Sequence, residues 1–455
     1  MSNQAQAKVV SPFLRGSVIY QLFLRPFTLE GTLKAATKLL PHIASLKVDI
    51  IYLCPTMVSD DDPNTQFWSD RQNASKLGNP KNPYRIKDYY NTDPEYGTNN
   101  DLRQFVDTAH RLGMLVILDL VYFHCGPTAV FIESNPDFVK RNPDGSVKNG
   151  PWHFPELNFA SSELREYLWK NMEYWVQQFD VDGYRTDVEG SVPADFWEEG
   201  RKRIEKIKPD VIMLAESENP KAVLKAHDIS YGFTWSTAIK NVFLDGKPAS
   251  HLVEKWTAMR DKMPVGTLFL RNLENHDISM DLGENRWNRI AEPDLVEAAT
   301  LLNFTIDGIP FIYNGEEIAD NSKHYIFANR DFGGKHVINW ALACTEKGSA
   351  RLNFFKNLIA MRHEIDALQF GGTRWLASDK PNELLAFTRE TEDQTVLVAI
   401  NTTNSVLEAT IQGSHSIADI AKVITKYGVK WTPAQDGSLK LQMLPYAYLV
   451  FNQEI

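Results

Sequence analysis

The chain has 455 residues, of which 43% are hydrophobic and 23% are charged, as in an ordinary globular protein. Its formal net charge is −10 and no Lys/Arg cluster stands out, which excludes nucleic acid and anionic membranes as partners, because both need a positive footprint. Residues 1–13 contain no apolar signal region, and the longest apolar stretch, 114–123, is too short to cross a bilayer. We therefore expect a soluble, cytoplasmic protein.

Short apolar runs alternate with helix-like segments through about residue 370. The runs are rich in Val, Ile, Leu and Tyr, which is typical of strands buried on both faces. In chain order they are 18–23, 49–53, 115–121, 181–187, 211–216, 229–234, 267–271 and 309–313. Eight such alternations predict an α/β fold, and they favour a closed (β/α)8 TIM barrel over an open sheet.

The segment after residue 160 shows the helical pattern between two strands. Apolar side chains recur there every three or four residues, at Leu164, Leu168, Met172, Trp175 and Phe179. Ser161 and Ser162 stand where a side-chain oxygen would cap free amides, and Glu163 suits the positive end of a helix. These features predict a helix that packs one face on the barrel.

Two connections in the predicted barrel are unusually long. The segment 54–99 follows the second strand and is polar, and the segment 125–160 follows the third strand and is rich in Pro and Gly. Loops of this length are uncommon in compact domains unless they carry function. In a barrel both would rise from the C-terminal ends of strands, where barrel active sites lie.

The pattern changes near Phe370. Apolar runs separated by turn signals follow at 384–389, 395–401, 406–411 and 447–452. They predict a small antiparallel β-sandwich at the C-terminal end of the chain.

Charged and polar residues stand where several predicted strands end. They are Asp119 near the end of the third strand and His124 after it, Arg185 and Asp187 at the fourth, Glu216 at the fifth, and Asn275, His276 and Asp277 after the seventh. A strand period of two puts Arg185 and Asp187 on one face. Any single one of these residues is explained by pairing at a strand end. Burying so many charges at one rim is costly without use, so the set indicates a functional site.

Carboxylates with an arginine and histidines suit acid–base chemistry. The cysteines Cys54, Cys125 and Cys344 lie far apart, and no His pair has ligand spacing, so we predict no metal site. The chain has no nucleophile elbow, phosphate-binding loop or dinucleotide fingerprint. The remaining chemistry is that of two carboxylates flanking a glycosidic bond, one attacking the anomeric carbon and the other moving the proton.

These segments resemble the α-amylase family of glycoside hydrolases (glycoside hydrolase family 13). Four short family segments occur in order, at 119–124, 183–187, Glu216 and 275–277. Further similar segments are 20–25, 84–90, 93–98, 155–158 and 308–313. The resemblance covers most of the chain. It implies a catalytic barrel over 1–124 and 161–370, a short inserted domain over 125–160, and a C-terminal β-sandwich over 371–455.

The resemblance also implies a role for each rim residue. Asp187 is the nucleophile, Glu216 is the acid/base, and Asp277 stabilises the oxocarbenium-like transition state. Arg185 keeps Asp187 ionised and Asp119 orders Arg185. The other implied substrate-binding residues are Tyr84, which stacks on the sugar, His124, His276 and Arg330. The implied activity is hydrolysis of α-glucosides with retention, through a covalent glycosyl-enzyme intermediate.

Departures from the family pattern narrow these expectations. Phe123 replaces an Asn that binds calcium in many relatives, and the loop 26–30 lacks an acidic calcium loop, so we expect no cofactor and no required calcium. The residues 188–190 lack the Lys-His pair of endo-acting amylases, which favours short malto-oligosaccharides over long starch. Lys81 stands where some exo-acting relatives carry an acid, so α-1,6 exo-specificity is not supported.

Two other functions remain open from the sequence. A transglycosylase, isomerase or phosphorylase would use the same carboxylates, and Lys81, Arg85 and Lys87 offer positive charge for a phosphate acceptor. A non-catalytic sugar-binding member ranks last, because such members generally lose catalytic carboxylates and this chain has all three. The segment 152–154 (Trp-His-Phe) is either packing or cleft wall. The sequence does not determine oligomeric state.

Overall fold

The computed structural model describes residues 4–280, 285–334, 336–413, 422–434 and 436–454. Its larger part is a closed barrel of parallel strands in the order β1-β10-β9-β8-β7-β6-β5-β2. The barrel strands are β1 (Ile19–Leu22), β2 (Ile50–Leu53), β5 (Leu115–Leu120), β6 (Gly183–Thr186), β7 (Ile212–Ala215), β8 (Ile229–Ser230), β9 (Leu268–Arg271) and β10 (Ile309–Tyr313). The predicted (β/α)8 barrel is confirmed.

Seven of the eight barrel strands are shorter than the apolar runs that predicted them, and β10 has the predicted bounds 309–313. All residues of β6 and β7 are buried, as expected for strands covered by helices outside and by packed side chains inside. These two strands end at Thr186 and Ala215, so Asp187 and Glu216 are the first residues beyond the ladder. The predicted strand 229–234 was too long, because the helix α9 (Phe233–Phe243) begins directly after Gly232.

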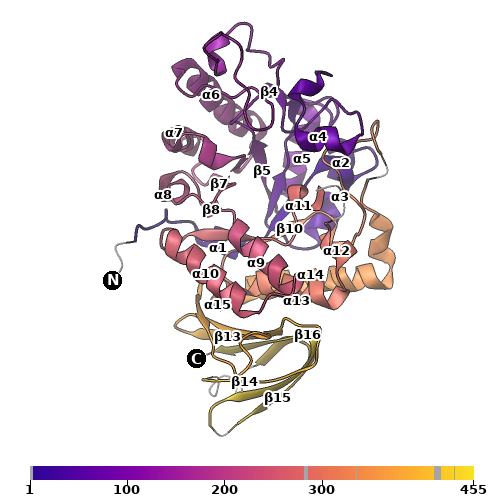
Figure 1. Cartoon of the computed structure of the whole chain (residues 1–455), viewed down its shortest axis with the longest axis vertical. Helices are drawn as coiled ribbons and strands as arrows, with labels where there is room; N and C mark the ends of the chain where they lie inside the picture. The colour runs from indigo at the N-terminus through magenta and orange to yellow at the C-terminus, as the bar shows by residue number, and fades with distance from the viewer. Residues whose placement is uncertain (1–3, 281–284, 335, 414–421, 435, 455) are drawn as a thin grey trace.

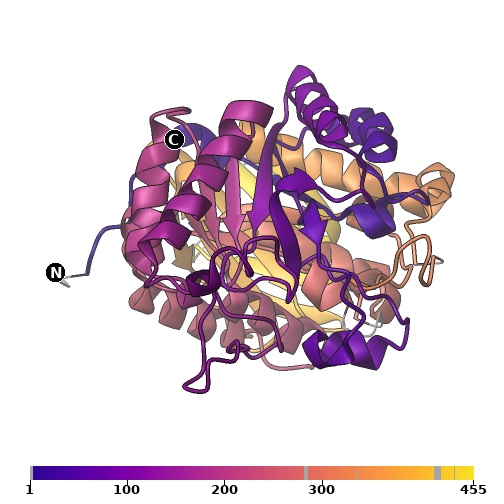
Figure 2. The same cartoon turned by 90° about the horizontal axis from the view of Figure 1, so that it is seen from above.

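Helices surround the barrel (Figure 2). Those not yet named are α1 (Pro12–Gly16), α2 (Leu24–Phe27), α3 (Leu33–Ala44), α4 (Asp70–Ser75), α5 (Asn99–Arg111), α6 (Ser162–Phe179), α7 (Ala194–Glu205), α8 (Ala222–Lys225), α10 (Ser250–Lys262), α11 (His276–Met280), α12 (Trp287–Ile290), α13 (Pro293–Thr305), α14 (Glu346–Glu364) and α15 (Asp366–Phe370). Short 3-10 turns are η1 (Thr65–Phe67), η2 (Pro136–Phe138), η3 (Glu189–Ser191), η4 (Glu316–Ile318) and η5 (Trp340–Cys344). All five apolar side chains that predicted α6 are buried.

The α6 N-cap provides a matched pair of serines. The Ser161 hydroxyl accepts a hydrogen bond from the Leu164 amide at 3.3 Å, whereas Ser162 is the first helical residue and is exposed. We expect Ser161→Ala to lower the free energy of unfolding by about 1 kcal/mol, because one amide loses its acceptor. Ser162→Ala should change it by less than about 0.5 kcal/mol. Equal losses for the two variants in urea titrations would show that the cap adds nothing.

The two long loops lie at the end of the barrel away from the C-terminal sheet (Figure 1). The loop after β2 contains a hairpin that the sequence analysis did not predict, formed by β3 (Met57–Ser59) and β4 (Ile86–Thr92). The loop over 125–160 contains the 3-10 turn η2 and isolated bridges, such as Val139 with Leu157. The Asp60 carboxylate joins the two loops, because it accepts hydrogen bonds from the Thr128 amide and hydroxyl at 2.7 and 2.8 Å.

The C-terminal part is antiparallel, as predicted, but its strands are connected differently from a two-sheet sandwich. They are β11 (Gly372–Trp375), β12 (Leu384–Glu390), β13 (Gln394–Asn401), β14 (Leu407–Ile411), β15 (Lys422–Pro433) and β16 (Leu439–Glu454). The long strand β16 pairs with β13, β14 and β15, so the described strands form one continuous sheet. The strands β11 and β15 were not predicted from the sequence.

Alternation along β12 shows why this sheet is buried on both sides. Leu385 and Phe387 belong to the core that the sheet shares with the barrel helices. Leu384 and Ala386 point the other way, into a second core that residues of β14, β15 and β16 complete. Two buried faces give β12 a nearly continuous apolar sequence.

Among the described residues, no helix is both long enough and apolar enough to cross a membrane.

Candidate active site

A pocket of about 240 Å³ opens at the C-terminal ends of the barrel strands. Its wall includes all three predicted catalytic carboxylates, Asp187, Glu216 and Asp277. Tyr84, His124 and His276, three of the predicted sugar-binding residues, also line it. The strand ends and the loop after β2 therefore bring together residues that are far apart in the sequence, such as Tyr84 and Asp277.

Arg185, on β6, is the central cation of the site. Its side chain is fully buried. One guanidinium nitrogen, Nη1, lies 2.6 Å from Asp119 Oδ1 and 2.8 Å from Asp187 Oδ1, and Nη2 lies 2.7 Å from Glu216 Oε1. Buried charges need such partners to offset desolvation. The shared guanidinium also draws the Asp187 and Glu216 carboxyls to the same point of the pocket.

We expect loss of this cation to destabilise the fold. Arg185→Met should lower the free energy of unfolding at neutral pH by about 3–5 kcal/mol, since buried carboxylates lose their counter-ion. The deficit should shrink as pH falls, because the orphaned carboxyls have raised pKa values and take up protons. Urea titrations at several pH values measure this. Arg165→Met, which breaks an exposed pair with Asp195, should cost less than about 1 kcal/mol and is the control.

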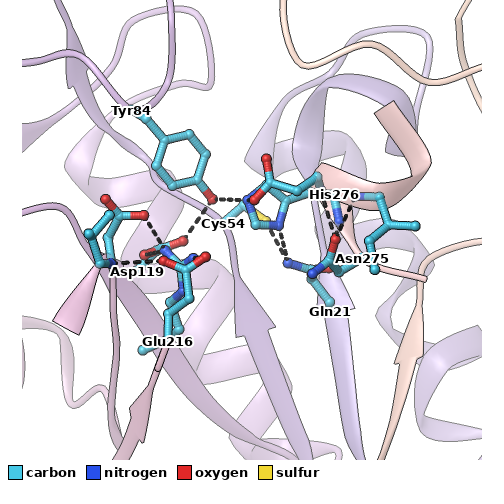
Figure 3. A network of polar contacts seen from close by, with 12 residues as sticks. Gln21, Cys54, Tyr84, Asp119, Glu216, Asn275 and His276 are labelled. Carbon is cyan, nitrogen blue, oxygen red and sulfur yellow. Dashed lines mark hydrogen bonds and ion pairs between the residues drawn. The ribbon is translucent and has the colours of Figure 1, made fainter. Parts of the chain in front are cut away.

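Asp119 lies beneath the pocket and organises its floor. Its Oδ2 accepts hydrogen bonds from the hydroxyls of Tyr52 and Tyr84 at 2.5 and 2.9 Å, and its Oδ1 contacts Arg185. Figure 3 shows the Tyr84 hydroxyl between Asp119 and His276. Asp119 does not itself line the pocket, so it acts on the substrate only through Tyr84 and Arg185.

The hydrogen bonds of His276 define its tautomer. The Oε1 of Gln21, from β1, accepts from the His276 amide at 3.1 Å, which leaves the Gln21 amide nitrogen 2.8 Å from His276 Nδ1 as a donor. The ring proton is then on Nε2, which donates to the Tyr84 hydroxyl at 2.6 Å. The Tyr84 and His276 rings stack with centroids 5.2 Å apart. A single tautomer of His276 therefore presents a fixed face to the pocket.

Both pocket histidines are neutral at physiological pH. Burial lowers the pKa of His124 to about 4, and burial likewise lowers the pKa of His276. The Nε2 atom of His124 is 2.7 Å from the Tyr84 carbonyl and donates to it. Its buried Nδ1 has no hydrogen-bond partner among the described residues.

The three carboxyls differ in electrostatic environment. Burial raises the pKa of Glu216, and the negative charges of Asp277 and Asp119 raise it further, while the positive charge of Arg185 lowers it. Burial also raises the pKa of Asp187, which Arg185 opposes. Two buried carboxyls on one guanidinium titrate together, so the pair keeps a shared proton to higher pH than an isolated acid. Although partial removal from water raises the pKa of Asp277, His276 and Arg71 together bring it down to about 2.

Arg71 is a site residue that the sequence analysis missed. It comes from α4, in the long loop after β2, and its Nη1 lies 2.8 Å from Asp277 Oδ1. Both side chains are about two-fifths exposed, at 42% and 41%, so this ion pair stands at the pocket mouth. The only sequence signal was an arginine in a long loop. Trp152 and Phe154, left open between packing and cleft wall, both line the pocket beside His124.

Arg330 is not among the residues that line the pocket, so the geometry does not support its predicted sugar-binding role. Its Nη1 donates to the backbone carbonyls of Glu30 and Glu95 at 2.9 and 2.8 Å. The turn at Asn329, closed by a hydrogen bond from its amide to the Phe332 carbonyl, faces Arg330 toward these loops. The strand pattern placed Arg330 after β10 but carried no information about the direction of the loop.

The basic residues considered for a phosphate acceptor are all engaged elsewhere. Lys81 pairs with Asp93 at 2.7 Å, and Lys87 pairs with Asp61 at 2.9 Å. Arg85 is buried, and its guanidinium donates to backbone carbonyls of the loop after β2. None of the three lines the pocket. In the part of the chain that the structure describes, no three His, Cys, Asp or Glu side chains form a metal site. Independence from calcium stays a prediction.

Comparison with known proteins agrees with this geometry. The family model described as "Alpha amylase, catalytic domain" matches residues 3–146 and 144–337. A cyclomaltodextrinase from Bacillus sp. is 25% identical over 399 residues, covering 82% of this chain and 65% of the relative. An intracellular maltogenic amylase from Bacillus subtilis (strain 168) is 26% identical, covering 84% and 63%. The chain thus spans somewhat under two thirds of the length of these relatives.

Solved structures show the same fold. The crystal structure of a maltogenic alpha-amylase from Thermotoga neapolitana superposes with a TM-score of 0.82 at 22% identity, covering 97% of this chain and 99% of the other. An alpha-amylase from Lactobacillus plantarum gives 0.77 at 23% identity, covering 97% and 100%. Because the family model matches most of the sequence and the barrel is complete, the chain belongs to the α-amylase family.

Proposed function

We propose that this chain hydrolyses short malto-oligosaccharides with retention of configuration, through a covalent glycosyl-enzyme intermediate. The observation that carries this proposal is the convergence of Asp187 and Glu216 on Arg185 in one pocket. Two carboxyl groups that flank the glycosidic bond in a sugar-sized pocket are the required parts of a retaining glycosidase. The relatives named cyclomaltodextrinase and maltogenic amylase support the substrate class.

The first step assigns one task to each carboxyl. Asp187 attacks the anomeric carbon as Glu216 gives its proton to the glycosidic oxygen, so the glycosidic bond breaks and the leaving sugar departs neutral. Asp277 binds sugar hydroxyls once the substrate displaces Arg71 from it. In the second step Glu216 takes a proton from water, the water oxygen bonds to the anomeric carbon, and Asp187 is released as a carboxylate.

The electrostatics of the pocket fit this division of tasks. The Arg185 Nη1 contact keeps Asp187 charged when the shared proton resides on Glu216. The neutral His124 and His276 and the hydroxyl of Tyr84 provide hydrogen bonds to sugar without adding charge. Trp152 and Phe154 provide an apolar wall suited to the flat face of a sugar ring.

A substrate panel tests the proposal. Starch, maltotriose, isomaltose, trehalose, sucrose and cyclodextrin are each incubated with the enzyme, and the configuration of the first product is followed by NMR. We expect α-configured products, with maltotriose or cyclodextrin turned over faster than starch. Products of β configuration would contradict the retaining mechanism. Repeating the panel with maltose or inorganic phosphate as acceptor tests the transglycosylase, isomerase and phosphorylase alternatives, and binding without turnover would indicate a non-catalytic member.

We also propose that the protein works in the cytoplasm. One relative is named an intracellular maltogenic amylase, which supports this location. Fractionation of cells that express the native gene, with activity on maltotriose as the readout, tests this proposal.

A further inference from the structure

The turn that follows the proposed nucleophile is strained. Val188 has φ 45° and ψ 45°, in the left-handed region. A β-branched side chain is a true outlier there, because its γ carbons crowd the backbone. The other non-glycine residues with positive φ in the described chain are not β-branched: Lys47, Lys76, His153, Asp180, Ala319 and Tyr446. Such strain persists only where surrounding contacts hold the backbone in place.

The strained conformation aims one amide at the proposed acid/base. The Val188 N–H donates to Glu216 Oε2 at 2.8 Å, while Oε1 of the same carboxyl lies against Arg185. The Val188 amide donor on Oε2 and the Arg185 cation beside Oε1 together fix the plane of the Glu216 carboxyl. An N–H donated to a carboxylate also favours its ionised form.

Glu189, the next residue, connects this turn to the loop after Glu216. Its side chain is 1% exposed. Its Oε2 accepts a hydrogen bond from the Ser217 hydroxyl at 2.6 Å and a longer one from the Asn219 amide at 3.4 Å. Ser217 directly follows Glu216, and the Ser217 carbonyl in turn accepts from the Ser230 hydroxyl at 2.5 Å. The carboxyl thus joins the turns after β6 and β7.

The buried carboxyl of Glu189 carries a cost in folding free energy, because neutral partners only partly replace the water it has lost. Both side-chain partners given for Glu189 are neutral, and burial raises the pKa of Glu189. An apolar residue at this position would avoid the desolvation of a carboxyl. The proposed mechanism gives Glu189 no task of its own, since it neither lines the pocket nor contacts Arg185.

We propose that Glu189 is a positioning residue that holds the Val188 amide against the Glu216 carboxyl by tying residues 187–189 to residues 216–219. This inference rests on the proposed function, because it assumes that Glu216 is the acid/base. The charged groups that act on Glu216 are Arg185, Asp277, Asp187 and Asp119, and none of them contacts Glu189. Removing Glu189 therefore leaves the charges of the site in place and changes only the position of one donor.

The first test is Glu189→Ala with maltotriose as substrate. We expect kcat to fall by about 10- to 100-fold with a smaller change in KM, because the proton donor is misplaced. The basic limb of the kcat/KM profile should move to higher pH, since Glu216 loses a donor that favours its ionised form. Glu189→Gln keeps an oxygen for Ser217 and should retain most of kcat. Glu297→Gln, on the far helix α13, is the control for loss of a shielded carboxyl and should leave the profile unchanged.

The second test uses glycine at position 188. Val188→Gly in the Glu189→Ala background should recover part of the lost kcat and return the basic limb toward the wild-type position. Glycine occupies the left-handed region without strain, so the turn no longer needs the tie to stay there. Ser217→Ala removes the hydroxyl that donates to Glu189, so it should move the basic limb of the kcat/KM profile to higher pH as well. This variant provides the test if Glu189→Ala folds poorly.

Crystal structures separate this inference from the proposed function. If Glu189→Ala keeps Val188 at positive φ with its amide on Glu216, or if its basic limb does not move, the positioning role is wrong. The structural readout needs no turnover. A wild-type enzyme without activity on any sugar of the panel would reject the proposed function. The Val188 conformation in crystals of the wild type and of Glu189→Ala would still show whether Glu189 holds the turn in place.

Discussion

Asp187→Asn should lower kcat on maltotriose by about 10⁴-fold or more, the loss typical of removing a nucleophile. The amide is the same size as the carboxyl and still accepts from Arg185, which now lies 2.8 Å from Asp187. It has no negative charge with which to attack the anomeric carbon, so no glycosyl ester forms. Release of reducing sugar measures the loss, and circular dichroism checks that the barrel is intact.

A smaller side chain at the same position identifies the attacking face. Asp187→Ala leaves room for a small anion, so added azide should restore turnover of an activated α-glucosyl substrate and give the β-glucosyl azide. Asp195→Asn, the same change at an exposed carboxyl of α7, should leave kcat unchanged. Near wild-type turnover by Asp187→Asn would end the assignment of the nucleophile.

Glu216→Gln should lower kcat on maltotriose by about 10²- to 10⁴-fold, because the leaving sugar then departs without a proton. The effect should depend on the leaving group. With α-glucosyl fluoride, whose departure needs little protonation, the first step should be nearly preserved while the second step, which needs a general base, stays slow. Mass spectrometry of the intact chain should then detect the accumulated glycosyl-enzyme.

The pH profile of the same variant checks the assignment. In the wild type, kcat/KM should decline as pH rises through the raised pKa of Glu216, because only the protonated acid donates. Burial is the main cause of that raised pKa, so activity is present below it and lost above it. Glu216→Gln should lack this decline, and Glu163→Gln, an exposed acid of α6, should keep it. An unchanged basic limb in Glu216→Gln would assign the proton donor elsewhere.

The barrel could be predicted because its evidence is local. Each strand appears as a short run of Val, Ile, Leu and Tyr, and α6 appears as a stripe of apolar residues behind a serine cap. The residue at which each strand stops was harder to predict from the sequence. The pattern ran through 229–234, whereas β8 stops at Ser230, and Phe233 and Thr234 belong to α9.

The site residues also fall into two groups, those that could be predicted from the sequence and those that could not. Residues directly beyond strands, such as Asp187 and Glu216, reach the pocket because the barrel fixes their position. Arg330 and Arg71 lie in loops, where a single turn decides the direction of a side chain. One was predicted in the pocket and contacts loop carbonyls instead, and the other was not considered and pairs with Asp277.

The sequence by itself determined the barrel, the antiparallel C-terminal region and the acids at the strand ends, because the spacing of apolar residues and the alternation of strands with helices can be seen in the sequence. Tertiary structure alone decided that one arginine serves three carboxylates, that β16 joins the C-terminal strands into one sheet, and that Glu189 ties two turns together. These features depend on contacts between residues distant in the chain. Each depends on whether contacts between distant residues offset the cost of removing polar groups from water, and a local sequence pattern does not predict those contacts.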